Sequence, residues 1–206
     1  MAGEIGMKKF IAILLVLCMT ISPAVIFAQE DDTCVFELKA LNILRDSDGY
    51  ELEKPVTRAE SAIYIARLLG YDNLKATDSS LPFTDVSADN PAYDAIAMLK
   101  DLGFVNGATE TTFEPDTNID KYMAAAMLVR ALGYEMVASG FGGYPEKYLI
   151  MGGRLKIFDG VSNGDTFTLR DFAQMMYNAL DVGMLEPSSY PAENYQVSKE
   201  NTLRKF

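Results

Sequence analysis

The chain has 206 residues, of which 49% are hydrophobic, and it contains no histidine and no tryptophan. Lys and Arg total 18 against 29 Asp and Glu, which gives a formal net charge of -11 at pH 7. A chain of this length can bury a substantial core. So acidic a surface repels nucleic acid at long range, and we expect no nucleic-acid partner. Binding of any anionic polymer must therefore depend on a local cationic pocket.

Residues 1–28 have the pattern of a secretory signal peptide. Lys8 and Lys9 precede an apolar run over residues 10–21, and Ala28 is a small residue suited to cleavage. The run is short for a membrane span of about 20 residues. We expect cleavage, no membrane association of the mature chain, and secretion to the surface of a bacterium. The mature chain would then keep one cysteine, Cys34, and no internal disulfide.

The first predicted structural unit covers residues 29–74. It has one helix from about residue 34 to 44 and a second from Arg58 to about Leu69, which Gly70 ends. Thr57 is suited to cap the second helix, and Glu60 lies three residues later, where its carboxylate can bond back to the cap. This spacing predicts a capping box.

The second unit covers residues 79–138. It opens with Phe83-Thr-Asp-Val86, and Asn90-Pro91 begins a helix that Gly103 ends. Asn106-Gly107 predicts a turn. The second helix of this unit is expected from Lys121 to Leu132, with Asp120 as its cap and no acid in the position of Glu60.

The third unit covers residues 139–187, and residues 188–206 are expected to form a tail or a linker. Its second helix runs from Leu169 to about residue 180, and Thr168 with Asp171 predicts another capping box. The three units repeat one order of motifs, so we expect them to stack around a shared core.

These motifs resemble the S-layer homology (SLH) family: the Phe-x-Asp-Val opening, the Gly-rich turn, the Phe113-Glu-Pro115 step and the Thr57-Arg-Ala-Glu60 helix start. The resemblance implies an all-α fold of three helix–loop–helix repeats in a pseudo-threefold arrangement. It also implies non-covalent attachment to a secondary cell-wall polysaccharide bearing acidic pyruvyl groups, in the cell wall or S-layer of a bacterium. Surface-layer proteins are further expected partners.

Arg58 is the main candidate for binding. It occupies the first helical position, where the helix dipole disfavours a cation by up to ~1 kcal/mol. A cation beside free backbone N–H groups can form an anion site, and the resemblance implies that this arginine meets the acidic group of the polymer. The alternative is an ion pair with Glu53 or Glu60. Replacing Arg58 by alanine is expected to weaken wall binding and leave folding nearly untouched.

Weaker candidates follow from the other two units. Lys121 holds the position of Arg58 in the second unit, and Arg170 lies one residue after it in the third. Asn106 and Gly107 match the loop that, by the resemblance, lies beside the groove, although a conformational need for glycine explains that turn equally well. Four residues are candidate sugar-binding aromatics in place of tryptophan, with core packing as the alternative: Tyr50, Tyr93, Phe113 and Tyr122.

The sequence contains no motif for catalysis: there is no histidine, no cysteine cluster of the metal-binding kind and no nucleophile elbow. We therefore expect no enzymatic activity, no metal and no cofactor. Two alternatives to wall binding stay open. One is a protein–protein interaction module, or a structural subunit of the surface layer, that has lost polymer binding. The other is a wall-active hydrolase using a pair of carboxylates.

Overall fold

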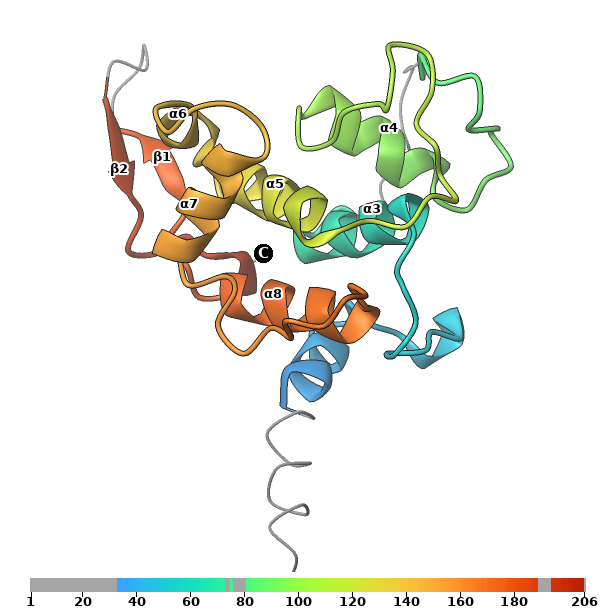
Figure 1. Ribbon diagram of the computed structural model, residues 1–206, viewed down its shortest axis with the longest axis horizontal. Helices are drawn as coiled ribbons and strands as arrows, with labels where there is room; N and C mark the ends of the chain where they lie inside the picture. Colours follow the sequence, from blue (N-terminus) through green and yellow to red (C-terminus); the bar gives the residue numbers. More distant parts are fainter. Residues whose placement is uncertain (1–32, 73–74, 76–80, 189–193, 206) are drawn as a thin grey trace, which may run out of the picture.

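The computed structural model describes residues 33–72, 75, 81–188 and 194–205. The predicted signal peptide lies outside this part of the chain. Most of the regular secondary structure in these residues is helical (Figure 1). After a helical stretch at residues 33–40, the elements in chain order are η1 (Asp46–Asp48), α3 (Arg58–Leu68), α4 (Tyr93–Asp101), α5 (Lys121–Ala131), α6 (Glu135–Ser139), α7 (Glu146–Arg154), α8 (Leu169–Ala179), β1 (Leu185–Pro187), β2 (Tyr195–Val197) and η2 (Leu203–Lys205).

The expectation of a helical fold is correct for most of the regular secondary structure among the described residues, and the all-α assignment needs one correction. Strands β1 and β2 pair in antiparallel register, with Leu185 opposite Val197 and Pro187 opposite Tyr195. The segment after α8 therefore forms a strand pair and also contacts the helical core. Leu203 is 3% exposed, and the Leu185 N–H donates to the Leu132 carbonyl at 2.9 Å.

Helices α3, α5 and α8 each contain 11 residues and each begin at a capping side chain. Thr57 accepts from the Glu60 N–H, and the Glu60 carboxylate accepts from the Thr57 N–H at 2.8 Å. Thr168 and Asp171 make the same reciprocal pair. Asp120 caps α5 by accepting from the backbone N–H of residue 123 at 2.8 Å. Each cap satisfies backbone donors that the first turn leaves without a helical partner.

The helices pack between the predicted units as well as within them. Helix α4 packs against α3, α7 and α8 pack against α5, and α3 contacts α5. In Figure 1, α3 and α5 lie end to end across the middle, with α4 on one side and α8 on the other. The buried side chains form one hydrophobic core with members from all three units. No helix within the described residues is long and apolar enough to span a bilayer.

Backbone hydrogen bonds join the start of one helix to the loop before another. At α3, the Arg58 N–H donates to the Thr117 carbonyl and the Ala59 N–H donates to the Pro115 carbonyl, both at 2.9 Å. At α8, the Leu169 N–H donates to the Lys54 carbonyl at 2.8 Å. These bonds fix the approach of one unit to the next.

Candidate functional site

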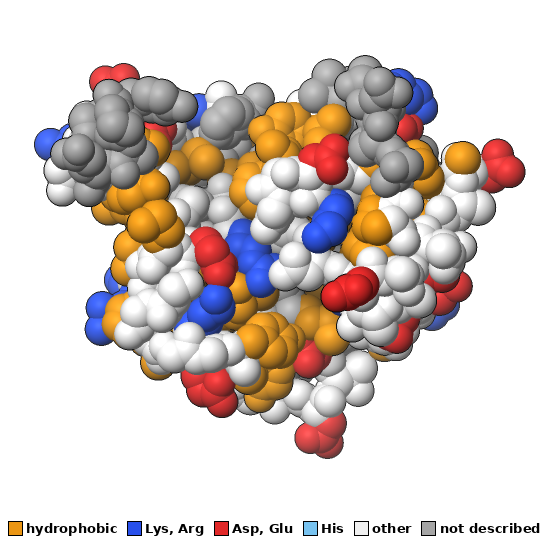
Figure 2. Space-filling model, turned by 90° about the horizontal axis from the view of Figure 1, so that it is seen from above, with side chains coloured by type: hydrophobic (Ala, Val, Ile, Leu, Met, Phe, Trp, Pro, Cys, Tyr) orange, Lys and Arg blue, Asp and Glu red, His pale blue; other side chains and the backbone are white. Residues whose placement is uncertain are grey.

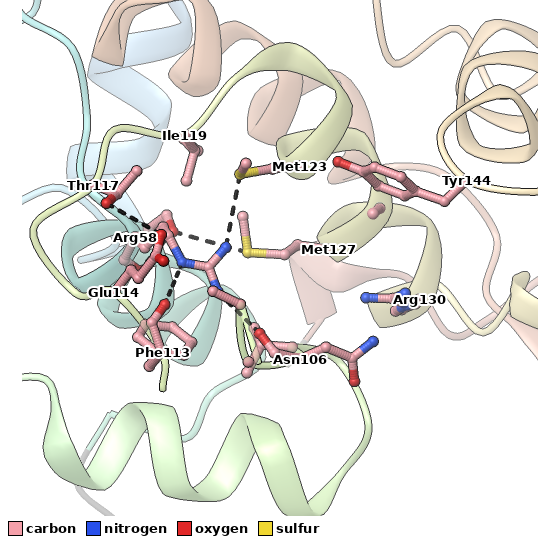
Figure 3. A pocket seen from close by; sticks show the side chains of 15 residues that line it. Arg58, Asn106, Phe113, Glu114, Thr117, Ile119, Met123, Met127, Arg130 and Tyr144 are labelled. Atoms are coloured by element: carbon pink, nitrogen blue, oxygen red, sulfur yellow. Dashed lines mark hydrogen bonds between the residues drawn. The ribbon is translucent and has the colours of Figure 1, made fainter. Parts of the chain in front are cut away.

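A cavity of about 360 Å³ lies between α3, α5 and the loops that precede α5 (Figure 3). Arg58 lies at one end and Arg130 with Tyr144 at the other, and methionines from α5 lie between them. The lining residues are Arg58, Ser61, Val105, Asn106, Gly107, Ala108, Phe113, Glu114, Thr117, Ile119, Met123, Ala126, Met127, Arg130 and Tyr144.

The Arg58 side chain is held in one orientation by backbone carbonyls. Its Nε donates to the Phe113 carbonyl at 2.7 Å, and its Nη2 donates to the Asn106 carbonyl at 2.9 Å. The guanidinium carbon lies 4.5 Å from the centroid of the Phe113 ring. The third nitrogen, Nη1, lies 3.7 Å from the Met123 sulfur. Two nitrogens are therefore anchored, and the Nη1 side of the group faces the cavity.

Arg58 has no carboxylate within ion-pairing distance among the residues that the structure describes. The alternative partners expected from the sequence are engaged elsewhere: Glu53 pairs with Arg170 at 2.6 Å, and Glu60 caps α3. Burial lowers the pKa of Arg58 below its usual value, and the more distant carboxylates of Glu114 and Asp85 oppose that shift only in part. An arginine stays protonated even so. The cavity therefore contains a half-buried positive charge without a directly paired negative charge.

The free backbone N–H groups expected at the start of α3 are not available to a ligand. The N–H groups of Arg58 and Ala59 donate to carbonyls of the 115–117 loop, and the Glu60 N–H donates to the Thr57 hydroxyl. The interpretation of this helix start as a backbone anion site is wrong for that reason. An anion in the cavity would be bound by the guanidinium.

The structure brings three of the five predicted binding residues together. Arg58, Asn106 and Gly107 line the cavity, and Lys121 and Arg170 do not. Lys121 lies at the start of α5 with its Nζ 5.9 Å from the centroid of the Phe158 ring.

Gly107 has a packing reason to be glycine. A Cβ at this position would lie 2.2 Å from the Thr109 carbonyl oxygen and 2.5 Å from the Phe83 ring. Asn106 is exposed and contributes its carbonyl to Arg58. The loop thus shapes the cavity through its backbone.

Most of the lining was missed by sequence reasoning, including its second arginine and its tyrosine. Arg130 lies in the last turn of α5, and no motif in the sequence indicates that it borders a cavity. Tyr144 lies between α6 and α7, and no motif in the sequence singles it out. Of the four aromatics proposed as sugar-binding substitutes, Phe113 lines the cavity, whereas Tyr122 is 39% exposed outside it.

The surface seen in Figure 2 places positive side chains beside hydrophobic ones near the middle of that face. Acidic side chains lie around and between them, in keeping with the net charge of -11. Attraction of an anion is thus a local property of this protein. Among the described residues there is no group of three or more histidine, cysteine or acidic side chains placed to hold a metal ion.

Comparison with known families assigns part of this site. The family model described as "S-layer homology domain" matches residues 82–121. This chain carries an S-layer homology domain. The matched segment supplies the Asn106–Gly107 loop, Phe113 and Lys121, whereas Arg58 on α3 lies outside it. The family match therefore covers only part of the cavity, because Arg58 lies before it and Met123, Met127, Arg130 and Tyr144 lie after it.

Similar proteins extend the likeness beyond that segment. The "Middle cell wall protein" of Brevibacillus brevis is 26% identical over 219 aligned residues, which cover 97% of this chain and 21% of that protein. The "Surface layer protein" of Brevibacillus choshinensis is 28% identical over 221 residues, 97% of this chain and 19% of that protein. A "Cellulosome-anchoring protein" of Acetivibrio thermocellus is 32% identical over 84 residues, 40% of this chain and 19% of that protein. The matched region spans about a fifth of the length of each of these relatives.

Proposed function

We propose that this chain is a non-covalent anchor that binds a secondary cell-wall polysaccharide in the Arg58 cavity at the bacterial surface. One observation carries the proposal: Arg58 is half-buried, fixed by two carbonyls, and without a carboxylate partner among the described residues. Burial removes part of the water that would otherwise stabilise this cation. The negative charge of an anionic ligand compensates for that loss, so the cation favours binding of an anion.

A pyruvyl substituent fits the chemistry of this end of the cavity. It carries a carboxylate beside a methyl group on the same carbon. The carboxylate can accept hydrogen bonds from Nη1 of Arg58, and the methyl group can pack against Met123 and Met127. Charge-assisted hydrogen bonds of this kind are roughly twice as strong as neutral ones.

The names of the relatives agree with an anchoring role. They describe a cell wall protein, a surface layer protein and an anchoring protein, each several times longer than the matched region. We infer that this chain performs the attachment step and has no catalytic activity of its own.

We further propose that α3, α5 and α8 are equivalent helices of three repeats related by a pseudo-threefold axis. Support comes from their equal length and from the backbone bonds that join the starts of α3 and α8 to loops of other units. On this proposal the cations in the first turns of these three helices contribute unequally to polymer binding. We expect the order of contribution to polymer binding to be Arg58, then Lys121, then Arg170, which is already paired with Glu53.

The second candidate function is a protein–protein interaction module or a structural subunit of the surface layer. The ion pair of Arg170 and the position of Lys121 outside the cavity favour it, because a polymer-binding repeat would need a cation free to meet the polymer. This candidate predicts binding to surface-layer proteins and indifference to the wall polysaccharide.

A sedimentation assay with purified wall sacculi separates the two functions. We expect the wild-type chain to co-sediment with native sacculi and to lose binding after mild acid removes the pyruvyl groups. Arg58→Gln should lose binding. Arg154→Gln is the matched control, because Arg154 is exposed and also has no carboxylate partner among the described residues. A folded Arg58→Gln protein that sediments like the wild type would exclude the Arg58 cavity and favour the interaction module.

Export has its own test. We expect cleavage near Ala28 and recovery of the product in the wall fraction, which N-terminal sequencing of surface material would identify. Recovery of an uncleaved chain in the membrane fraction would contradict this.

A further inference from the structure

The two ends of the cavity differ in charge. Arg58, at one end, has no directly paired carboxylate in the described part of the chain. Arg130, at the other, has its Nε 3.3 Å from a carboxylate oxygen of Glu135. Figure 3 shows the two arginines on opposite sides, with Met123 and Met127 between them. The cavity therefore has an arginine without a directly paired carboxylate at one end and an ion-paired arginine at the other.

Several donors hold Glu135 ionised beside Arg130. Lys147 donates to Glu135 at 2.6 Å, and the Tyr148 hydroxyl donates to it at 2.9 Å. Burial raises the pKa of Glu135, but these hydrogen bonds and the charge of Arg130 outweigh it, so the pKa lies below the usual value. A second acid would gain less here than at Arg58, because Glu135 already offsets part of the positive charge of Arg130 and Lys147.

Tyr144 presents an aromatic ring at the same end. Its side chain is 56% exposed, and its ring packs edge-on against the buried Tyr148 ring at 6.0 Å and 66°. Within the described residues its hydroxyl has no hydrogen-bond partner, and Figure 3 shows that hydroxyl pointing toward Met123. Tyr148 is itself held by hydrogen bonds to Arg130 and Glu135. The Tyr144 ring is therefore held in place by Tyr148, and the rest of its surface is open to a ligand.

We propose that Tyr144 and Arg130 form a second subsite, which takes an uncharged sugar ring next to the acidic residue held by Arg58. This inference rests on the proposed function and adds to it a direction of binding. The acidic residue of the glycan lies at Arg58, and its neutral neighbour packs one face on Tyr144.

The chemistry of the subsite fits a neutral sugar. A sugar ring has an apolar C–H face that packs on an aromatic ring and hydroxyls that bond to a phenol or to the unused N–H groups of a guanidinium. Arg130 uses three of its N–H donors on Glu135, Phe104 and Tyr148, which leaves donors on a guanidinium that carries five. The cavity volume of about 360 Å³ falls within the range of ligand pockets and exceeds what a carboxylate and methyl group would fill.

Calorimetry with two soluble probes tests the subsite. The first probe is a hexose methyl glycoside carrying one pyruvyl ketal, and the second is the same acidic ring linked to one neutral hexose. We expect wild type to bind the two-ring probe more tightly. Tyr144→Ala should weaken the two-ring probe about 3- to 10-fold, the range expected for loss of an aromatic packing contact, and leave the one-ring probe unchanged.

Two further variants control the result. Tyr144→Phe keeps the ring and should retain most of the preference, and Tyr122→Ala removes an exposed tyrosine outside the cavity and should change neither affinity. Thermal melts establish that each variant is folded. Equal affinity of the wild type for the two probes would overturn the subsite, as would a Tyr144→Ala protein that weakens both alike or neither.

The proposed function and the subsite fail in different ways. If the folded wild type binds neither probe, or Arg58→Gln binds the one-ring probe as the wild type does, the proposed function fails and this inference fails with it. If Arg58→Gln loses the one-ring probe and Tyr144→Ala has no effect on the second ring, the function stands and only the subsite is rejected.

Discussion

Arg58 has two roles in this structure, and the second alters what its removal should do. Its side chain donates to the carbonyls of Phe113 and Asn106, so it ties α3 to the loops that precede α5. The expectation that Arg58→Ala would leave folding nearly untouched considered only the helix cap, which indeed does not involve this side chain. The tertiary contacts argue for a loss of stability as well as of binding.

We expect Arg58→Ala to lower the free energy of unfolding by about 1–3 kcal/mol, because two carbonyls lose a charged donor. Denaturation in urea measures this. Arg58→Lys should recover part of the stability but not the two-point grip on a carboxylate, because an ammonium lacks the planar fork. An Arg58→Ala protein as stable as the wild type would show that water replaces the guanidinium without penalty.

Gly107 gives a second prediction for a single residue. Gly107→Ala should destabilise the fold by about 1–3 kcal/mol, because its Cβ would overlap the Thr109 carbonyl and a backbone atom cannot move aside cheaply. Gly153→Ala is the matched control. Nothing lies within 4 Å of a Cβ at Gly153, which lies in α7, so alanine there should be neutral or stabilise by up to ~1 kcal/mol. Thermal denaturation of both variants checks the contrast, and equal melting temperatures would contradict it.

At the scale of elements, the returning C-terminal segment is tied to both ends of the fold. The Arg204 guanidinium lies 2.7 and 2.9 Å from the Asp181 carboxylate, just after α8, and 2.8 Å from Glu37 in the helical residues 33–40. These bonds raise the pKa of Arg204 and lower that of Asp181. These ion pairs of Arg204 with Asp181 and Glu37 link the third unit to the first.

We expect Arg204→Ala to reduce stability by about 1 kcal/mol, the upper end for exposed ion pairs, because three charges form a network with bidentate geometry. Hydrogen exchange should show the loss concentrated in residues 33–40 and the β1–β2 segment. Arg154→Ala, which removes an exposed arginine outside any ion pair of the described residues, serves as the control. Protection in both segments unchanged from the wild type would mean that burial of Leu203 alone holds them.

At the scale of the whole molecule, the units depend on one another. Because α7 and α8 both pack on α5, deleting residues 135–206 removes most of the cover of that helix. We expect the shortened chain to be insoluble or molten, with helical far-ultraviolet circular dichroism but no cooperative unfolding. A fragment that unfolds cooperatively would show that two units complete a core alone.

Stability should also depend on acidity in a definite direction. The carboxyl groups of Asp48, Asp85, Glu135 and Asp181 all have pKa values below their usual ones. Arginine partners favour the charged forms of Asp48 and Asp181, backbone N–H groups that of Asp85, and Lys147 with Tyr148 that of Glu135. Their contribution is present above the unfolded pKa values of 3.8 and 4.5 and is lost as pH falls through the lower folded values. We expect little change between about pH 5 and 8, since the chain has no histidine, and a fall below about pH 4. Denaturation midpoints over that range measure this, and a midpoint constant down to pH 2 would contradict it.

The sequence by itself determined the local features. Helix starts at Thr57, Asp120 and Thr168 follow from spacing within four residues, so they could be predicted without knowledge of the fold. The SLH motifs likewise identified the loop at residues 106–107 and the candidate Arg58. These features depend on neighbours in the chain, which a sequence displays directly.

Only the tertiary structure decided which cations line the cavity and which form ion pairs with carboxylates. Arg58 and Arg170 both lie in the first turn of a capped helix, yet Arg58 lines the cavity and Arg170 pairs with Glu53, 117 residues away. Packing also decided that the N–H groups at the start of α3 are occupied and that Arg130 and Tyr144 border the cavity. Contacts over such separations depend on how helices cross, and no local pattern records that.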